Sequence, residues 1–262
     1  MITFSIITVT FNAEKVVETT LKSVVRQTYG RVEHLIIDGQ SSDRTCDIVR
    51  SYQERLDNQA ETKCLSLVSE PDKGIYDAMN KGLATAQGDF VCFINAGDAF
   101  RDSEVLERIA ARVEHEGDGD LPAIIYGDTD IVDYDGRFLA HRHLSAPHRL
   151  KWTSFRKGML VCHQAFYVRR DIAAAIPYDL RYRFSADIDW CIRVMKEADA
   201  QGADFLNMNE VLANYLYEGQ TTRNHRASLK ERFAVMRTHY GLLPTVLMHL
   251  WFAVRKPFLS KF

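Results

Sequence analysis

The sequence lacks the features of a disulfide-stapled, zinc-stabilised or membrane-spanning protein. Its five cysteines are odd in number and form no CxxC pair, which argues against a disulfide framework and a structural zinc site. Glycine (14) and proline (6) are too few for a low-complexity linker protein. The longest largely apolar run, residues 242–254, covers 13 positions, whereas a membrane span needs about 20. We therefore expect a globular, cytoplasmic protein with reduced cysteines.

Neither sign of charge dominates the composition. With 33 Lys and Arg against 35 Asp and Glu, the net charge is −2, and nothing points to nucleic acid as a partner. The distribution is uneven, because residues 220–262 hold eight Lys or Arg and one acid while the preceding 219 residues carry −9. This basic end favours contact with an anionic surface or a phosphate group, and a solvated helical face is the alternative.

Strand and helix patterns alternate over the first hundred residues. The run at 3–10 lacks the basic region of a signal peptide and is followed by polar Asn12 and Glu14, so we expect a buried strand. Further strands are predicted at 32–39, 64–69 and 89–95, and helices at 13–27, 41–57, 74–86 and 102–116. This alternation is typical of a mostly parallel sheet with helices on both faces.

The second half of the chain has a different pattern. Asp135-Gly136 separates two apolar runs and predicts an antiparallel hairpin. Helices are expected at about 186–198, 224–240 and 243–255. We divide the chain into an α/β domain over 1–220 and a basic helical appendage over 221–262. Within the domain, residues 1–100 would bind a nucleotide and residues 101–220 an acceptor.

Polar side chains follow three of the predicted strands. They lie at 10–14, 38–43 and 95–98, and ligands of parallel sheets bind outside the carboxyl ends of the strands. The GxGxxG, GxxxxGK[ST] and GxSxG motifs are all missing, which argues against a dinucleotide-binding oxidoreductase, a P-loop nucleotidase and an α/β-hydrolase. Without a Walker lysine, a diphosphate here would need a cation bridged by a carboxylate, and Asp98 is placed for that role.

Four runs in order resemble family 2 inverting glycosyltransferases of the GT-A fold. They are SIITVTFN (5–12), IIDGQSSDRT (36–45), EPDKGIYDAMNKG (70–82) and GDFVCFINAGD (88–98). Beyond them the similarity is confined to CHQAF (162–166) and SADIDW (185–190). The resemblance implies a GT-A-like mixed sheet flanked by helices, a nucleotide-diphosphate sugar donor with UDP preferred over GDP, and a divalent metal, Mg²⁺ or Mn²⁺.

The resemblance also implies roles for individual residues. Thr10, Asn12 and Glu14 would frame the nucleoside, and Asp38 would accept a hydrogen bond from a ring N–H of the base. Asp72 and Lys73 would lie near the nucleoside and the ribose or sugar, with Asn95 beside the donor. The metal-binding run of the family falls on Asn95-Ala96-Gly97-Asp98, where only Asp98 can be an anionic ligand. This departure weakens the expected dependence on metal.

The catalytic Glu-Asp pair of the family falls on Ala186-Asp187, so only the aspartate is retained. Inversion by single displacement needs one general base, and an acid at a helix N-terminus is held ionised by the helix dipole. We predict Asp187 as this base, and Asp189 as a charge that stabilises the helix. Arg223, in the polar basic segment 220–226, is expected either in a lid over the diphosphate or in an ordinary surface loop. His163-Gln164 is expected near the acceptor or diphosphate, or as a buried polar pair.

The predicted function is transfer of a hexosyl or N-acetylhexosaminyl group to a lipid-linked or oligosaccharide acceptor in surface polysaccharide biosynthesis. The alternatives are a sugar-phosphate nucleotidyltransferase, whose Gly-rich, Arg-bearing loop is missing at 10–14, and a non-catalytic sugar-nucleotide-binding module. The C-terminal helix has an apolar stripe flanked by basic residues and would lie on the inner face of the plasma membrane, or would pack on the core with Trp251 buried. The stripe is Leu247, Leu250, Trp251, Val254 and Phe258, and its flanks are Arg255, Lys256 and Lys261.

Overall fold

The computed structural model describes residues 1–57, 63–116, 120–217 and 225–255. Within these residues, one mixed sheet has the strand order β3-β2-β1-β4-β8-β6-β9-β5, with β7 paired to β6. The strands are β1 (Phe4–Thr10), β2 (Val32–Asp38), β3 (Cys64–Ser69), β4 (Phe90–Phe93), β5 (Ala99–Phe100), β6 (Ile124–Val132), β7 (Phe138–His141), β8 (Phe166–Arg169) and β9 (Phe205–Leu216). The helices are α1 (Val17–Val25), α2 (Thr45–Asp57), α3 (Ile75–Thr85), α4 (Val105–Glu116), α5 (Arg170–Ala175), α6 (Ala186–Ala200), α8 (His225–Tyr240) and α9 (Leu242–Arg255), with 3-10 turns η1 (Trp152–Lys157) and η2 (His163–Ala165).

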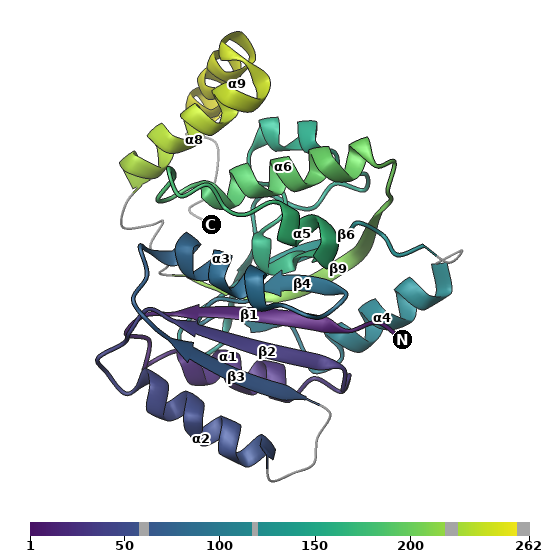
Figure 1. Ribbon diagram of the computed structural model, residues 1–262. Helices are drawn as coiled ribbons and strands as arrows, with labels where there is room; N and C mark the ends of the chain where they lie inside the picture. Colours follow the sequence, from purple (N-terminus) through teal and green to yellow (C-terminus); the bar gives the residue numbers. More distant parts are fainter. Residues whose placement is uncertain (58–62, 117–119, 218–224, 256–262) are drawn as a thin grey trace.

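The parallel part of the sheet is β3-β2-β1-β4, and it agrees with the alternating pattern of the sequence. Every residue of β1 and of β4 is buried, as expected of strands covered on both faces. Helices α1 and α2 cover one face, and α3, α5 and α6 lie on the other (Figure 1). Thr10 pairs with Asp38, and Asp38 with Ser69, so the carboxyl ends of the three strands lie side by side at one edge.

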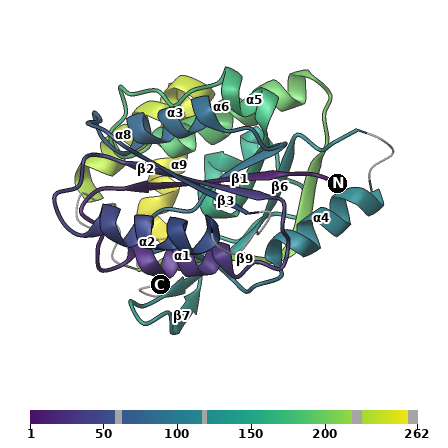
Figure 2. The same cartoon turned by 60° about the horizontal axis from the view of Figure 1, so that its bottom comes forward.

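The second half of the chain extends the sheet with antiparallel and parallel pairs. β8 runs antiparallel to β4 and β6, whereas β6 and β9 are parallel. The predicted hairpin is confirmed, because β6 and β7 pair antiparallel, and β7 projects from the body (Figure 2). Sequence patterns predicted neither β8 nor β9. β9 carries three asparagines and a glutamate and has register shifts against β6, so it shows no clean alternation of apolar and polar residues.

The two C-terminal helices differ in how they contact the domain. Val235 and Met236 of α8 are fully buried in the main hydrophobic core, so α8 is built into the domain. α9 packs only one side on that core, through the partly buried Met248 and Phe252. The pair stands at one end of the molecule (Figure 1). No helix in the described part of the chain is long and apolar enough to cross a membrane. The predicted boundary at residue 220 lies outside the described residues.

Candidate active site at the strand ends

Asp38 lies at the end of β2 and ties the neighbouring strand ends together. Its buried carboxylate accepts hydrogen bonds from the hydroxyls of Thr10 (2.9 Å), Ser41 and Ser69 (2.7 Å), from the Ser41 backbone N–H (2.8 Å) and from the Cys46 thiol (3.2 Å). Burial raises the pKa of Asp38, but these bonds outweigh burial and hold the pKa below its usual range. A carboxylate offers about four lone-pair sites, so contact with a nucleobase N–H, which stays a prediction, would have to displace one of these donors.

The loops after β1 and β2 are joined by a ladder of hydrogen bonds. Asn12 has a positive φ of 49°, its N–H donates to the Ser41 hydroxyl, and its side-chain oxygen accepts from the Ser42 N–H (2.9 Å). Glu14 accepts from the Arg44 N–H (3.2 Å), and its own N–H donates to Asp43 (3.1 Å). The predicted nucleoside residues of β1 are therefore held by the β2 loop.

Gly39 brings Asp72 and Phe11 to this edge. A Cβ at residue 39 would collide with the Asp72 carboxylate, which would have to turn aside, and would lie 3.4 Å from the Phe11 ring. The Phe11 ring is 66% exposed, and an exposed aromatic face beside polar groups is a surface on which a base can stack. Sequence reasoning missed Phe11, although an aromatic residue directly after a buried strand was the available signal. Lys73 is exposed, and its backbone N–H donates a hydrogen bond to the Asp77 carboxylate (2.9 Å).

Asp98 lies in the turn after β4 and braces two distant segments. Its Oδ2 accepts from Gln164 Nε2 (2.7 Å) and its Oδ1 from the Leu216 backbone N–H (3.0 Å). The side chain is buried, and burial raises the pKa of Asp98 to about 6, although the bonds from Gln164 and Leu216 lower it. Gln164, predicted as a possible substrate neighbour, is thus a buried partner of Asp98.

The predicted site for Mg²⁺ or Mn²⁺ consists of Asp98 and its neighbour Asn95. Across residues 1–57, 63–116, 120–217 and 225–255, no three His, Cys, Asp or Glu side chains gather closely enough to hold a metal ion. Both oxygens of Asp98 already accept hydrogen bonds, and Asn95 offers only a neutral, buried amide oxygen without a partner in these residues. The described side chains therefore do not fit a cation held by protein alone, whereas a cation shared with a diphosphate needs only one or two carboxylates.

Asp187 lies in the first turn of α6 and is joined to the strand ends through His163. Asn95 Nδ2 donates to His163 Nε2 (3.0 Å), which leaves the ring proton on Nδ1, 3.8 Å from Asp187 Oδ2. The Ile188 N–H also donates to Asp187 (2.9 Å). Burial raises the pKa of Asp187, but His163 and Ile188 outweigh burial, so the pKa lies below its usual range. The side chain is 21% exposed. Asp187 is thus an ionised carboxylate within reach of solvent.

A second group holds Asp187 from the first half of the chain. The Tyr76 hydroxyl donates to Asp187 Oδ1 (3.3 Å), across 111 residues of sequence. The Tyr76 ring stacks on Tyr178 (5.4 Å between centroids), which stacks on Trp190 of α6 (4.9 Å). Asn80 locks the Tyr178 backbone with two hydrogen bonds, of 3.0 and 2.7 Å. The predicted motif at 70–82 thus contacts Asp187 through Tyr76, and the sequence did not predict this contact.

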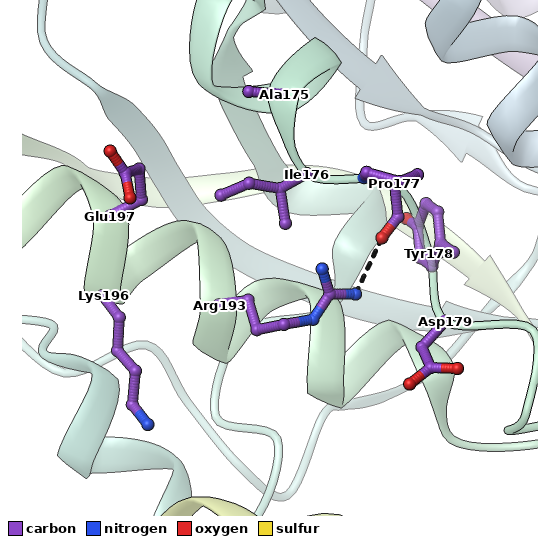
Figure 3. Close-up of a pocket in the computed structure, with 8 residues that line it drawn as sticks. All are labelled: Ala175, Ile176, Pro177, Tyr178, Asp179, Arg193, Lys196 and Glu197. Carbon is purple, nitrogen blue, oxygen red and sulfur yellow. Dashed lines mark hydrogen bonds between the residues drawn. The ribbon is translucent and has the colours of Figure 1, made fainter.

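Asp189 has other partners than Asp187. Asp189 is buried between Arg193 Nε (2.7 Å) and His239 Nε2 (2.8 Å), and so joins α6 to α8. A cavity of about 590 Å³ beside α5 and α6 is lined by Tyr178, Asp179 and Arg193 among others, and contains none of the predicted site residues (Figure 3). Arg223 and most of the proposed lid lie outside the described residues.

Comparisons with known sequences identify relatives over most of the chain. Residues 5–176 match Glycosyl transferase family 2. A PGL/p-HBAD biosynthesis glycosyltransferase of Mycobacterium bovis is 35% identical over 191 residues, which are 72% of this chain and 68% of the relative. The amylovoran biosynthesis glycosyltransferase AmsB of Erwinia amylovora is 29% identical over 221 residues, 82% of this chain and 69% of the relative.

Solved structures share the fold at low sequence identity. S. aureus TarS 1–349 in complex with UDP-GlcNAc has a TM-score of 0.68 and 17% identity, over 99% of this chain and 74% of that one. The chain spans 44% of a longer TarS structure. Glucosyl-3-phosphoglycerate synthase from Mycobacterium tuberculosis, in complex with Mn²⁺, UDP and glucosyl-3-phosphoglycerate, has a TM-score of 0.60 and 15% identity, over 92% and 81%.

These likenesses confirm the predicted fold class, a mixed α/β sheet flanked by helices as in GT-A glycosyltransferases. The sequence match covers well over half of the chain, and a relative at 35% identity is covered over more than two thirds of its length. The chain therefore belongs to Glycosyl transferase family 2.

Proposed function

We propose that this chain is an inverting glycosyltransferase of surface polysaccharide or glycolipid biosynthesis. It moves a hexosyl or N-acetylhexosaminyl group from a nucleotide-diphosphate sugar, preferably UDP-linked, to a lipid-linked or oligosaccharide acceptor. The observation that carries the proposal is Asp187, an ionised and partly exposed carboxylate linked to the end of β4 through His163 and Asn95. The names of the two relatives, both biosynthetic glycosyltransferases, support it.

The reaction is a single displacement with Asp187 as general base. An acceptor hydroxyl loses its proton to the Asp187 carboxylate while its oxygen bonds to the anomeric carbon. The bond from that carbon to the diphosphate oxygen breaks on the opposite face, and its electron pair leaves with the nucleotide. The lowered pKa of Asp187 keeps the base ionised at neutral pH. His163 and Tyr76 orient the carboxylate, each through the contact described above.

The nucleoside binds at the ends of β1 and β2. Phe11 stacks on the base, and Asp72 and Lys73 lie beside the ribose or sugar. This position is framed by Thr10, Asn12 and Glu14. Hydrogen bonds between residues 12–14 and residues 41–44 hold the loop after β1 in place. Asp38 acts mainly by fixing the ends of β1, β2 and β3 through its hydrogen bonds.

The metal requirement is decided by Asp98→Asn. An asparagine can keep both bonds if the Gln164 amide turns to present its oxygen, whereas an amide is a poor substitute for an anionic metal ligand. We expect the variant to retain turnover at every Mn²⁺ concentration, in accord with the bracing contacts. A loss that high Mn²⁺ restores would instead establish Asp98 as a metal ligand.

The outer face of α9 lies on the inner surface of the plasma membrane, near a lipid-linked acceptor. Leu243, Leu247 and Leu250 are 71%, 58% and 59% exposed, and Trp251 is 42% exposed, which favours this interpretation over packing on the core. The side chains of Val254 and Phe258, and the basic flank at 255–261, lie outside the described residues. Flotation of wild type and Leu247→Asp/Leu250→Asp with anionic and neutral vesicles tests it. Equal flotation of the two proteins, or none, contradicts membrane contact.

Incubation with a panel of UDP- and GDP-sugars tests the enzymatic proposal. The panel is first reduced by thermal shift, because a ligand that binds only the folded state raises the melting temperature. Slow release of UDP by wild type and not by Asp187→Asn is expected. Consumption of pyrophosphate would point to a nucleotidyltransferase, and binding without turnover to a sugar-nucleotide-binding module.

A further inference from the structure

The turn that follows β4 is held in place by α1. The side chain of Thr20 is fully buried, and its hydroxyl accepts from the Gly97 N–H (2.9 Å) and donates to the Asp98 carbonyl (2.7 Å). The Asp98 N–H in turn donates to the Asn95 carbonyl (2.9 Å). Gly97 has a φ of 99°, a conformation that favours glycine. The backbone of this turn is therefore fixed, and so is the position from which the Asn95 side chain projects.

Two consecutive residues of η2 contact the two ends of this turn. His163 Nε2 lies 3.0 Å from Asn95 Nδ2, and Gln164 Nε2 donates to Asp98 Oδ2 (2.7 Å). The turn and η2 thus form one hydrogen-bonded unit, although Asn95 and His163 are 68 residues apart in the sequence. The His163 side chain is 13% exposed and lies between Asn95 and Asp187.

The charge of Asp187 determines which nitrogen of His163 carries the proton. Nδ1 lies 3.8 Å from Asp187 Oδ2. An ionised carboxylate can only accept, so Nδ1 is the donor, and in the neutral ring Nε2 must then accept. The Asn95 amide NH₂ is the group that donates to Nε2. The contact of Nδ1 with Asp187 is longer than a hydrogen bond, and such contacts often tighten in an active site when substrate binds.

We propose that Asn95 is a positioning residue of the catalytic base, because its amide holds His163 in the tautomer and orientation that present Nδ1–H to Asp187. The inference rests on the proposed function. The hydrogen bond made by one ring nitrogen sets the protonation of the other, and the opposite tautomer would direct a lone pair at the Asp187 carboxylate. Asn95, which the sequence predicts beside the donor, thus acts on the base through His163.

A double-mutant cycle of Asn95→Leu and His163→Asn tests the proposal. Leucine keeps the size of Asn95 and removes its hydrogen bond. Asparagine at residue 163 keeps a donor at the place of Nδ1 and has no atom at the place of Nε2. We expect Asn95→Leu to lower turnover about tenfold in wild type and less than about twofold in the His163→Asn background, because residues in contact are coupled.

Binding measurements and a matched control accompany the cycle. Calorimetric titration should give the same UDP-sugar affinity for wild type and Asn95→Leu, because Asn95 acts on the base. The control is Asn207→Leu, which removes another partly buried amide, one that donates to the Pro147 carbonyl (3.1 Å). It should retain the turnover of wild type. Melting temperatures of all variants show whether a loss of turnover comes from unfolding.

Equal losses in the two backgrounds would show that Asn95 acts independently of His163 and would overturn the inference. A loss of UDP-sugar affinity would overturn it too, because it would assign Asn95 Oδ1, which has no partner in the described residues, to the donor. So would a loss of turnover that high Mn²⁺ restores. If wild type and Asp187→Asn release UDP equally fast, the proposed function itself fails. Additive losses in a protein that still needs Asp187 remove the inference alone.

The ¹⁵N spectrum of the histidine side chains gives a second test, which does not depend on activity. The signals of His163 are those that are missing from the spectrum of His163→Asn. We expect His163 of wild type to carry its proton on Nδ1 at neutral pH. A proton on Nε2 would leave the Asn95 NH₂ without an acceptor and would overturn the inference.

Discussion

The first and the second half of this protein hold their predicted site carboxylates in different ways. Asp38, in the first half, is held by donors from β1, β3, α2 and the loop after β2, and all of them lie within 31 residues of it. Asp187, in the second half, is held by Ile188 and His163 from its own half, and by Tyr76, which is 111 residues away. The first arrangement fixes the strand ends around a buried carboxylate, and the second leaves the Asp187 carboxylate partly exposed. All of these contacts of Asp38 thus come from its own half of the chain, whereas Tyr76 joins Asp187 to the other half.

The variant expected to have the largest effect is Asp187→Asn, which removes the proposed reactive carboxylate and keeps its size. General-base catalysis typically contributes about 10²–10⁴-fold, so turnover should fall by about that factor. Donor affinity should hardly change, because the base acts on the acceptor. Steady-state assays at saturating donor, together with calorimetric binding of donor, measure both.

Asp189→Asn is the control for that experiment, since Asp189 lies between Arg193 and His239. It should lower stability and leave turnover much closer to wild type. An inactive Asp189→Asn beside an active Asp187→Asn would move the base by two residues. In wild type, activity should decline only when the pH falls through the lowered pKa of Asp187, well below neutral.

Asp98→Asn tests whether a carboxylate of the first half can act only as a brace. The raised pKa of about 6 means that folding favours protonated Asp98. Its contribution to stability is full below the ordinary value of 3.8 and is lost as the pH rises through about 6. At about 1.4 kcal/mol per pH unit, this is on the order of 3 kcal/mol.

The asparagine variant does not titrate at this position. Its free energy of unfolding, relative to that of wild type, should therefore rise by up to that amount between pH 4.5 and pH 7.5. Urea unfolding at both pH values checks it. A difference between the two proteins that is independent of pH would show that Asp98 has an ordinary pKa.

Asp38→Asn should destabilise the strand ends and loops at the proposed nucleotide site. The amide NH₂ would face donors that now point at a carboxylate, and an unsatisfied buried polar group costs about 2 kcal/mol. Because the pKa of Asp38 is lowered, its stabilisation is present above the ordinary carboxyl pKa and is lost as the pH falls through the folded value. We expect a lower melting temperature and weaker UDP binding, with less effect on turnover. A selective fall in turnover with unchanged UDP affinity would contradict this role.

Tyr76→Phe should have the smallest effect, because it removes one long hydrogen bond and keeps the stack on Tyr178. Turnover should fall a few-fold, and the acidic limb of the pH–rate profile should move to higher pH, since a donor that favours the charged carboxylate is lost. UDP affinity should stay unchanged. A profile that keeps its midpoint would show that Tyr76 does not orient the base.

The sequence determined the parallel part of this fold and the family to which the chain belongs. Apolar runs and helical spacing predicted β1 to β4 and α1 to α4, because strands buried on both faces leave an unmistakable pattern. The motifs at 5–12, 36–45, 70–82 and 88–98 predicted a site at one edge of the sheet. Sequence patterns missed β8 and β9, since strands whose pairing is decided by distant partners need no periodicity of their own.

Only the tertiary structure decided which carboxylates are exposed. Asp38, Asp98, Asp187 and Asp189 all accept hydrogen bonds, yet three of them are buried and Asp187 remains partly exposed. The physical reason is that the pKa and the reactivity of an ionisable group depend on burial and on the groups that point at it. Those groups come from segments that meet only when the chain is folded.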